Sequence, residues 1–577
     1  MASSNREPLL GQDDGDAESG STSCFFDRFT HALKRIFSAH NLATAAGPVA
    51  TAIIFCIAKY RGFDDGSGDM VASSKKIGAM LGALVWMAVW WVLEPVPIAI
   101  TSLLPLVLFP FFEVMDSDMV AANYMNDTVV LMLGTFILAL AINRYNLHKR
   151  MALKILMLVG GEEMNPRFVL LGFICGPAFV SMWMSNTPAA AMMIPMATGL
   201  LHNIEPAHHI ERTKSKMTAL IEEGKMEEDV DEHSENAIAK EAIRKYSQAV
   251  IIGVTYGIAL GGMATLIGCG PNLVLPGIYT ELFPGAPQVT FLQWMKFALP
   301  LVIIWMIPMW RFLCWKFVPQ SAVSVIEASL NRNLVLKTYA ELGSISFAEI
   351  FILVEFILLI ALWITRSFGQ TPGWGIFFEN FPNEGTVAIA AAILLFVVPS
   401  RKKSGEKLMD WKACKDISWS VILLLGAGFA LSAGIKQSGV STWISINMQF
   451  FEYLPKWLVI PVLATLLSAA TEFMSNAACA TLFIPIFAEV AASIDLHPLF
   501  LMIPSVFASN YAFILPSGTP PNAVALGTAY VSVNDMAPPG LLMHALGILL
   551  LGILTPTLGD WVFGLNVPAS SLPWLAN

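Results

Sequence analysis

Charged residues are scarce in this sequence, and their scarcity excludes most classes of soluble protein. Only 13% of the 577 residues are charged, against about 25% in a typical soluble chain, and 55% are hydrophobic. A membrane-spanning helix needs roughly 20 consecutive apolar residues, and about ten to twelve segments reach that length. The composition therefore predicts an all-α polytopic membrane protein.

Cysteine is also rare, and no pair of cysteines has the spacing of a metal or redox motif. The seven cysteines are scattered, with no CxxC among them: Cys24, Cys56, Cys175, Cys269, Cys314, Cys414 and Cys479. This pattern argues against a disulfide framework and a structural zinc site. A membrane-embedded hydrolase would need a nucleophile beside a base, whereas His544 stands alone in its apolar run. We predict that the protein is not an enzyme, has no organic cofactor and binds no nucleic acid.

Lysine and arginine are missing from several connecting segments, and their distribution predicts the orientation in the membrane. Basic clusters occur at 28–35, 148–154, 212–216, 311–316 and 401–403. The segments 114–127, 280–292 and 367–384, and the tail after residue 564, contain neither residue. Because basic loops stay in the cytoplasm, we expect a cytoplasmic N-terminus and a C-terminus on the opposite side. The pair Lys75-Lys76 fits this scheme poorly.

One polar insertion interrupts the apolar chain. Residues 205–245 hold 18 charged residues and are rich in Lys, Glu and Ala. This composition predicts a cytoplasmic helical linker.

The sequence contains an internal repeat in which polar interruptions recur in the same order. "SNTP" (185–188) interrupts one apolar run, and "SNA" (475–477) interrupts another run 290 residues later. Each is followed by a Gly-rich Pro-Asn break, "GGMATLIGCGPNLVLPG" (261–277) and "LPSGTPPNAVALG" (515–527). The chain is therefore predicted to consist of two homologous halves.

Interruptions of this kind have a physical meaning in a membrane protein. Non-helical backbone at membrane depth is tolerated only where protein groups or a water-filled cavity form hydrogen bonds with its N–H and C=O groups. Paired interruptions in two halves point to a transporter's binding site. Helix N-termini at the breaks favour an anion, and freed carbonyls with Ser and Asn oxygens suit a hard monovalent cation. The alternative is that these small residues serve only to pack helices together. Packing could account for a single motif, but it does not explain why four motifs occur at matching positions in the two halves. We also expect Thr187 to cap a helix that begins at Pro188.

No Lys or Arg lies in the apolar core near either Ser-Asn break, so an anion there would be held by helix dipoles and neutral donors. Glu94 and Glu472 are acidic residues that lie in apolar runs and need an explanation. A charge at the centre of a membrane helix costs roughly 2.5–3.5 kcal/mol on insertion scales. Glu472 could relay a proton or a cation; we favour a structural role in which it accepts hydrogen bonds from its hairpin.

Five motifs in order carry a family resemblance. They are "AVWWVLEPVPIAITSLLPLVLFP", "MSNTPAAAMMIP", "GCGPNLVL", "SNAACATLFIPI" and "GTPPNAVALG". Together they resemble the divalent anion–sodium symporter family, solute carrier family 13, which contains dicarboxylate and citrate carriers. "YMNDTVVLMLGTFILALAINRYNLHKRMAL" and "LLGFICGPAFVSMWMSN" are similar to its plant vacuolar branch. The resemblance covers about residues 42–565.

The resemblance implies an elevator-type homodimer built from two inverted repeats, with re-entrant hairpins and unwound helices. A scaffold domain would hold the dimer in the lipid bilayer while a transport domain carries the site across. The implied hairpins are 168–203 and 457–493. The implied parts are a cytoplasmic tail (1–40), scaffold segments (41–163 and 321–455) and transport segments (164–320, including the insertion 205–245, and 456–577).

Matched position by position, the resemblance also implies two sodium sites and one anion site. The first sodium site would use Ser181, Ser185, Asn186 and Gly268. The second would use Thr471, Met474, Asn476 and Gly518, with Met474 and the glycines acting through backbone carbonyls. The dianion would contact Asn186, Thr187, Asn476 and Ala477, flanked by Cys269, Gly270, Thr519 and Pro520.

Two positions depart from the family pattern, so the identity of the substrate stays undecided. Dicarboxylate carriers of the family usually have Thr where this chain has Ala477, and Ser or Thr where it has Cys269. We expect secondary active transport of C4-dicarboxylates (malate, succinate, fumarate), coupled to sodium or protons or working by exchange. A citrate or sulfate carrier is the alternative within the family, and an anion channel is the alternative outside it. The plant branch implies the vacuolar membrane, with the plasma membrane as the alternative.

Overall fold

The computed structural model describes residues 39–63, 70–202, 232–330, 332–367, 372–401, 405–447, 454–516 and 518–575. Regular structure in these ranges is helical, with two isolated β-bridges and no strand. Nine helical segments in the described ranges are long and apolar enough to cross a membrane, and five further apolar helices are shorter. The predicted all-α polytopic class is confirmed. The predicted tail 1–40 lies outside the described residues except for its last two.

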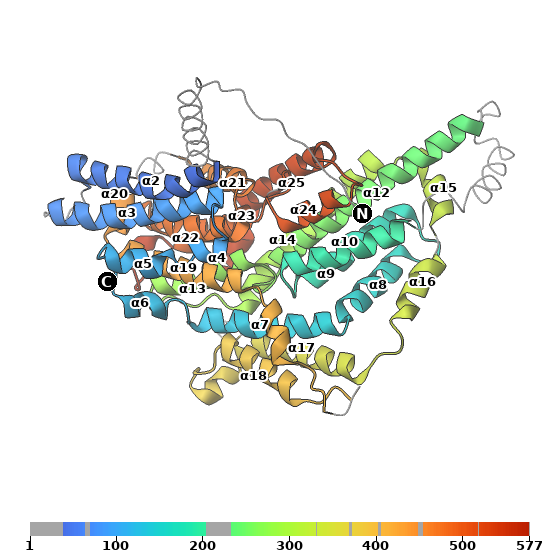
Figure 1. Ribbon diagram of the computed structural model, residues 1–577, viewed down its shortest axis with the longest axis horizontal. Coiled ribbons are helices and arrows are strands. Elements are labelled where there is room, and N and C mark those ends of the chain that lie inside the picture. Colours follow the sequence, from blue (N-terminus) through green and yellow to red (C-terminus); the bar gives the residue numbers. More distant parts are fainter. Residues whose placement is uncertain are drawn as a thin grey trace, which may run out of the picture.

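The first half of the described chain forms helices α2 to α14 (Figure 1). Before the first hairpin these are α2 (Ala39–Arg61), α3 (Met70–Leu93), α4 (Ile98–Thr101), α5 (Leu104–Phe111), α6 (Ser117–Ala122), α7 (Asp127–Arg144) and α8 (Leu147–Gly160). They are followed by α9 (Pro166–Ser181), α10 (Asn186–His202), α12 (Glu232–Met263), α13 (Gly270–Leu282) and α14 (Phe291–Phe317). Residues 232–245 of the predicted insertion are thus the start of a long helix. Its earlier part lies outside the described residues.

The second half forms α15 to η6. Its first elements are α15 (Gln320–Ser329), α16 (Arg332–Glu341), α17 (Phe347–Arg366), η2 (Trp374–Phe378), α18 (Glu384–Val397), η3 (Trp411–Asp416), α19 (Trp419–Gln437) and α20 (Val440–Asn447). The remainder are α21 (Lys456–Thr471), α22 (Asn476–Ser493), α23 (Pro498–Ser509), α24 (Pro520–Gly527), α25 (Val533–Leu554), η5 (Thr555–Gly559), α26 (Asp560–Phe563) and η6 (Ala569–Ser571). Capping boxes start three of the long helices: Thr290 with Gln293, Ser346 with Glu349, and Ser532 with Asp535.

The two Ser-Asn interruptions are the tips of helical hairpins. Hairpin 1 is α9 and α10, joined at residues 182–185, and hairpin 2 is α21 and α22, joined at 472–475. Figure 1 shows hairpin 1 towards the right and α22 towards the left of the molecule, so the two hairpins approach its middle from opposite ends. The predicted helix start at Pro188 is wrong by two residues, because α10 begins at Asn186 and includes Thr187 in its first turn. Ser185, which precedes it, holds the cap position.

The Pro-Asn breaks separate pairs of helices in both halves in the same way. Non-helical backbone at 264–269 links α12 to α13, and non-helical backbone links α23 to α24. The Asn272 side-chain amide donates to the carbonyls of Gly262 (2.9 Å) and Thr265 (2.6 Å). Asn522 bonds the carbonyls ten and seven residues before it in the same manner, at 3.0 and 2.9 Å. In each break, an asparagine near the start of the following helix therefore holds the non-helical backbone in place by two hydrogen bonds.

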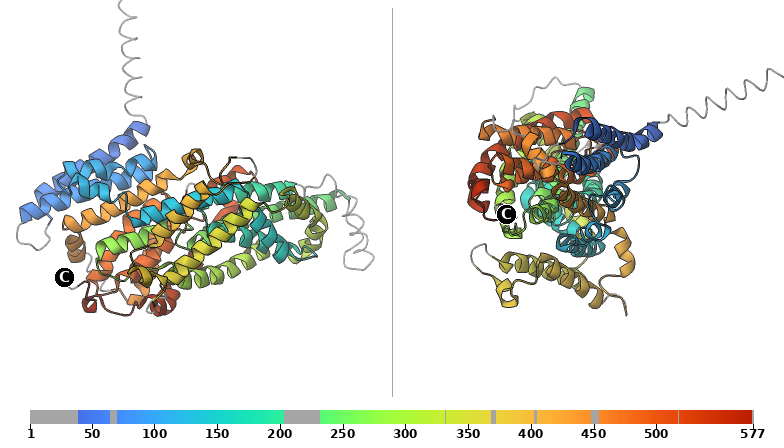
Figure 2. Two further views of the ribbon diagram at one scale, coloured as in Figure 1. Left: turned by 90° about the horizontal axis from the view of Figure 1, so that it is seen from below. Right: turned by 90° about the vertical axis from the view of Figure 1, so that its left-hand side faces the viewer.

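Helices α7, α17 and α18 form one side of the molecule. Figure 1 and the right-hand view of Figure 2 show α17 and α18 as a layer below the main bundle. Helix α7 packs closely on α18, where a Cβ added at Gly134 would lie 2.7 Å from the Ala388 backbone. Trp363 of α17 donates from Nε1 to the carbonyl of Glu384 at 3.1 Å. Residues of all three helices line a small cavity of about 190 Å³.

Two arginines bond to loop carbonyls far away in the chain: Arg150, from a predicted cytoplasmic cluster, and Arg167. Nη2 of Arg150 donates to the carbonyls of Leu342 and Gly343 at 3.1 Å each, and Nη2 of Arg167 donates to Val318 at 3.2 Å. The orientation across the membrane remains a prediction.

Candidate functional site

One cavity of about 700 Å³ collects the tips of both hairpins and the ends of both breaks. All eight residues predicted to surround the anion line it: Asn186, Thr187, Cys269, Gly270, Asn476, Ala477, Thr519 and Pro520. Of the predicted sodium ligands, Ser185, Met474 and Gly518 also line it. Ser181 and Thr471 are fully buried behind the cavity wall. The fold thus brings together segments that are about 290 residues apart in the chain.

At the first break, oxygen atoms from hairpin 1 face the backbone of the 262–268 segment. The Ser181 hydroxyl donates to Oδ1 of Asn186 at 2.9 Å. A Cβ at Gly262 would lie 2.1 Å from that same Oδ1, and one at Gly268 would lie 2.5 Å from the Gly262 carbonyl oxygen. Only glycine permits this approach. The four groups form one continuous cluster, and it contains three of the predicted first sodium ligands.

The second break repeats this arrangement with one oxygen more. The Thr471 hydroxyl lies 2.9 Å from Oδ1 of Asn476 and 2.6 Å from the carbonyl oxygen of Ser509. A hydroxyl has one proton to donate, so it can satisfy only one of these two acceptors at a time. Three oxygens that share one proton are suited to a hard cation such as sodium. The first break also has a spare acceptor, since Oδ1 of Asn272 is buried without a hydrogen-bond partner.

The anion side of the cavity is built from helix N-termini. Helices α10, α13, α22 and α24 all begin at it, with Asn186, Gly270, Asn476 and Pro520. The residues before α13, α22 and α24 make no side-chain capping hydrogen bond. First-turn N–H groups and the positive ends of the helix dipoles therefore face the cavity. Among the described residues that line it, Glu94 is the only charged one, and none is Lys or Arg.

Glu472 has a structural role, but with a different partner from the one we predicted. Its carboxylate accepts from the backbone N–H groups of Phe513 and Ile514 at 3.0 Å each and of Leu515 at 2.8 Å. These residues belong to the second break rather than to the hairpin. Nε2 of His544 on α25 lies 3.0 Å from the same carboxylate. His544, which stands alone in its own apolar run, therefore has a partner from a distant part of the chain.

The sequence reasoning missed residues that complete the cavity. Oδ1 of Asn510 accepts from the Cys269 thiol at 3.4 Å, so the sulfur replaces a hydroxyl in that contact. Asn510 stands in an apolar run just before the second break, a signal that could have identified it. Ser418 and Val421, at the start of α19, also line the cavity together with Glu94. These three come from predicted scaffold segments, so the cavity lies between the two predicted domains.

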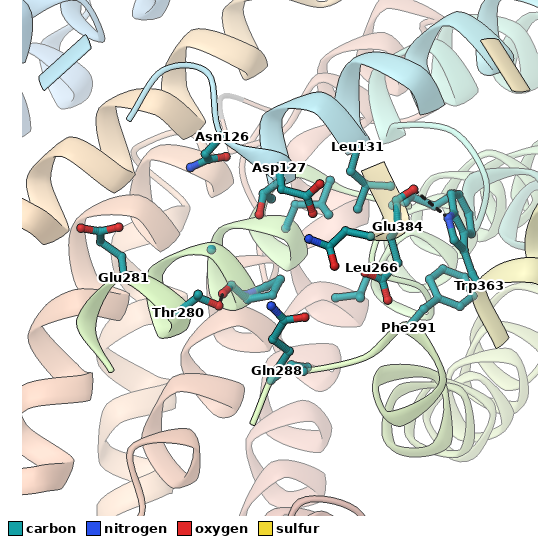
Figure 3. A pocket seen from close by; sticks show the side chains of 17 residues that line it. Asn126, Asp127, Leu131, Leu266, Thr280, Glu281, Gln288, Phe291, Trp363 and Glu384 are labelled. Carbon is teal, nitrogen blue, oxygen red and sulfur yellow. Dashed lines mark hydrogen bonds between the residues drawn. The ribbon is translucent and has the colours of Figure 1, made fainter. Parts of the chain in front are cut away.

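A second, smaller cavity of about 190 Å³ lies next to the first break (Figure 3). Leu266 and Ile267 line it, whereas Cys269 and Gly270 of the same segment line the larger cavity. The first break thus separates two cavities. The smaller one collects polar and acidic side chains from α7, α13 and the start of α18, as Figure 3 shows: Asn126, Asp127, Thr280, Glu281 and Glu384.

The chain is similar to known membrane transporters over most of its length. The model of the sodium:sulfate symporter transmembrane region matches residues 72–565. The rat Na(+)/citrate cotransporter is 36% identical over 521 residues, which are 84% of this chain and 91% of that protein. The sodium-dependent dicarboxylate transporter SdcS of Staphylococcus saprophyticus is 34% identical over 491 residues, covering 85% and 87%. The mouse Na(+)/dicarboxylate cotransporter 3 is 33% identical over 545 residues, covering 86% and 90%.

The fold also resembles a solved structure at low sequence identity. MtrF of Neisseria gonorrhoeae, described as one of a class of antimetabolite efflux pumps, aligns with a TM-score of 0.50 and 12% identity. The alignment covers 76% of this chain and 84% of MtrF, and it supports the fold alone. The family match and the three relatives establish more. The chain belongs to the sodium:sulfate symporter family, the divalent anion–sodium symporters of solute carrier family 13, and it is a transporter rather than an enzyme.

Proposed function

We propose that the protein is a secondary active transporter of C4-dicarboxylates such as malate, succinate and fumarate, driven by sodium. The observation that carries this proposal is the single cavity in which four helix N-termini meet beside two oxygen clusters. The N-termini suit the two carboxylates of a dianion, and the oxygen clusters suit sodium. Both Asn186 and Asn476 belong to an oxygen cluster and to the cavity wall, so they couple the two ligands.

The substrate and ion assignments also draw on the relatives, whose names describe sodium-coupled citrate and dicarboxylate transport. Citrate is the second candidate, favoured by Ala477, which is smaller than the Thr that is usual in dicarboxylate carriers and leaves room for a bulkier anion. Sulfate is a third candidate. Protons in place of sodium, or exchange of one anion for another, are the alternative driving forces. An anion channel would lack saturation and countertransport.

We further propose an elevator mechanism in a homodimer with inverted repeats. Hairpins 1 and 2 would move with their breaks as the transport domain (164–320 and 456–577), past a scaffold domain (41–163 and 321–455). The cavity supports this division, because its wall combines hairpin and break residues with Glu94, Ser418 and Val421 from the proposed scaffold ranges. We place the N-terminus in the cytoplasm and favour the vacuolar membrane, with the plasma membrane as the alternative.

Uptake into proteoliposomes tests the proposal. Labelled malate, succinate, citrate and sulfate would be offered separately, with sodium and pH gradients imposed one at a time. We expect saturable succinate or malate uptake that an inward sodium gradient accelerates. Uptake that responds to neither gradient nor to internal anion, and does not saturate, would indicate a channel and contradict the proposal.

A further inference from the structure

Helix α17 carries three charged side chains, and the middle one differs from the other two. Glu349, near the start, forms an ion pair with Arg150 at 3.4 Å. Arg366, at the end, binds both carboxylate oxygens of Glu384 at 3.0 and 3.1 Å. Both oxygens of Glu355 are buried without any hydrogen-bond partner. Two charges on this helix are therefore neutralised by partners and the third is not.

Glu355 points into the protein and not towards lipid. It is 6% exposed and lies on the same helix face as Ile352 and Leu359, which are 0% and 2% exposed. The opposite face carries Val354 and Ile357, which are 58% and 56% exposed. Lipid headgroups and water therefore do not reach the carboxyl group in this conformation.

The neighbouring position on α17 touches the tip of hairpin 1. The rings of Phe356 and Trp183 meet edge to face with their centroids 5.0 Å apart. Nε1 of Trp183 is also buried without a hydrogen-bond partner. Buried unpartnered polar groups are few in folded proteins and call for an explanation. The unpartnered donor Trp183 thus contacts Phe356, and the unpartnered acid Glu355 is the residue that precedes Phe356 on α17.

Charged groups on the helices around α17 do not compensate Glu355. Helix α7 carries Asp127 and Arg144 at its two ends, and α18 carries Glu384 at its start. Helix α14 carries Lys296 near its start, and Arg311 and Lys316 towards its end. On hairpin 1, Arg167 is at the start of α9 and His202 at the end of α10. Glu355 is the ninth of the 20 residues of α17, and none of these groups pairs with it among the described residues.

An ionised carboxylate is strongly disfavoured in such a position, and a buried acid without a counter-ion takes up a proton instead. We propose that Glu355 is a proton-binding site at the contact between α17 and hairpin 1, and that it is protonated in this conformation. If hairpin 1 withdraws from α17, water reaches the carboxyl group, the O–H bond breaks and the proton passes to water. This coupling rests on the proposed elevator function, in which hairpin 1 moves. A proton on Glu355 then favours the conformation described here, and ionisation favours the other one.

Infrared difference spectroscopy tests the proton itself, without transport. Purified full-length protein in lipid membranes would be compared with Glu355→Gln at neutral pH, in H₂O and D₂O. We expect the wild type to show a protonated-carboxyl band that shifts in D₂O and is lost in Glu355→Gln. Glu341→Gln, which removes an exposed carboxylate on α16, is the matched control and should keep the band. A wild-type spectrum without a protonated carboxyl at neutral pH would overturn the proposal, even if Glu355→Gln failed to fold.

Uptake measured over a pH series tests the coupling. Because the protonated fraction of an acid falls about tenfold per pH unit above its pKa, wild-type uptake should contain a pH-dependent component. Glu355→Gln should lose that component, whereas Glu355→Asp should keep it. Identical pH profiles for wild type and Glu355→Gln would overturn the coupling. The two proposals can fail separately. If the wild type shows the protonated-carboxyl band but takes up no anion, the proposed transport function is refuted and the proton site is supported.

Discussion

Nε2 of His544 lies 3.0 Å from Oε1 of Glu472, although 72 residues separate them in the chain. The contact joins α25 to the tip of hairpin 2. The same carboxylate accepts three backbone N–H groups of the second break. A Cβ at Gly518 would lie 3.2 Å from its other oxygen, Oε2. Glu472 therefore positions the backbone that forms the proposed second sodium site.

Replacing Glu472 by Gln should weaken sodium binding more than anion binding. The amide NH₂ would face a backbone N–H that the carboxylate now satisfies. A hydrogen bond to a charged group contributes about 1.5–3 kcal/mol, which corresponds to roughly ten- to hundredfold in affinity. The measurement is the sodium concentration for half-maximal uptake at saturating dicarboxylate. Glu489→Gln is the control, because Glu489 on the same hairpin bonds to Ser441 instead. Equal sodium dependence in Glu472→Gln and wild type would contradict this role.

Asn186→Ala and Asn476→Ala should each abolish uptake while the protein remains folded. Each asparagine supplies an oxygen to a proposed sodium site and also lines the anion cavity. Uptake of labelled succinate and gel filtration in detergent would report the two properties separately. Asn447→Ala is a suitable control, because Asn447 is exposed and donates within its own helix to the carbonyl of Trp443. Normal transport by either variant would show that the Ser-Asn interruption containing that asparagine does not belong to the binding site.

Ala477→Thr should tighten dicarboxylate binding and weaken any citrate uptake. Ala477 lines the cavity, and the added hydroxyl could donate to a substrate carboxylate. One such bond contributes about 0.5–3 kcal/mol, or roughly two- to hundredfold in affinity. Ala477→Val separates volume from hydrogen bonding, because Val has the shape of Thr without the hydroxyl. Tightening by both variants, or by neither, at fixed pH and sodium would place the residue outside the anion contacts.

Gly134→Ala should destabilise the α7–α18 layer. The added Cβ would lie 2.7 Å from the backbone of Ala388, and overpacking of this kind typically costs about 1–3 kcal/mol. Gly199→Ala is the matched helical change, since no atom of the described residues lies within 4 Å of its added Cβ; there Ala should stabilise the helix by about 0.5–1 kcal/mol. Thermal unfolding of the two variants in detergent should therefore shift in opposite directions. An unchanged melting temperature in Gly134→Ala would show that α18 can shift to accommodate the methyl group without lowering the free energy of unfolding.

The sequence alone determined the membrane class and the two-fold repeat, and its family resemblance implied eight of the residues that line the larger cavity. These features are local. Apolar run length, a Ser-Asn interruption and a Pro-Asn break each change the backbone where they occur, so their spacing can be read without knowing the neighbours. The start of α10 was misplaced by two residues because Thr187 and Ser185 are both acceptable cap residues.

Only the tertiary structure decided which polar groups in the apolar runs have partners. From the sequence we named His544 as alone in its apolar run and did not single out Glu355 at all. Packing places His544 against Glu472 and leaves Glu355 without a partner. Likewise, Asn510 reaches Cys269 across 241 residues. Such contacts depend on how helices from distant parts of the chain rotate and pack against each other. Hydropathy and motif spacing do not encode that information.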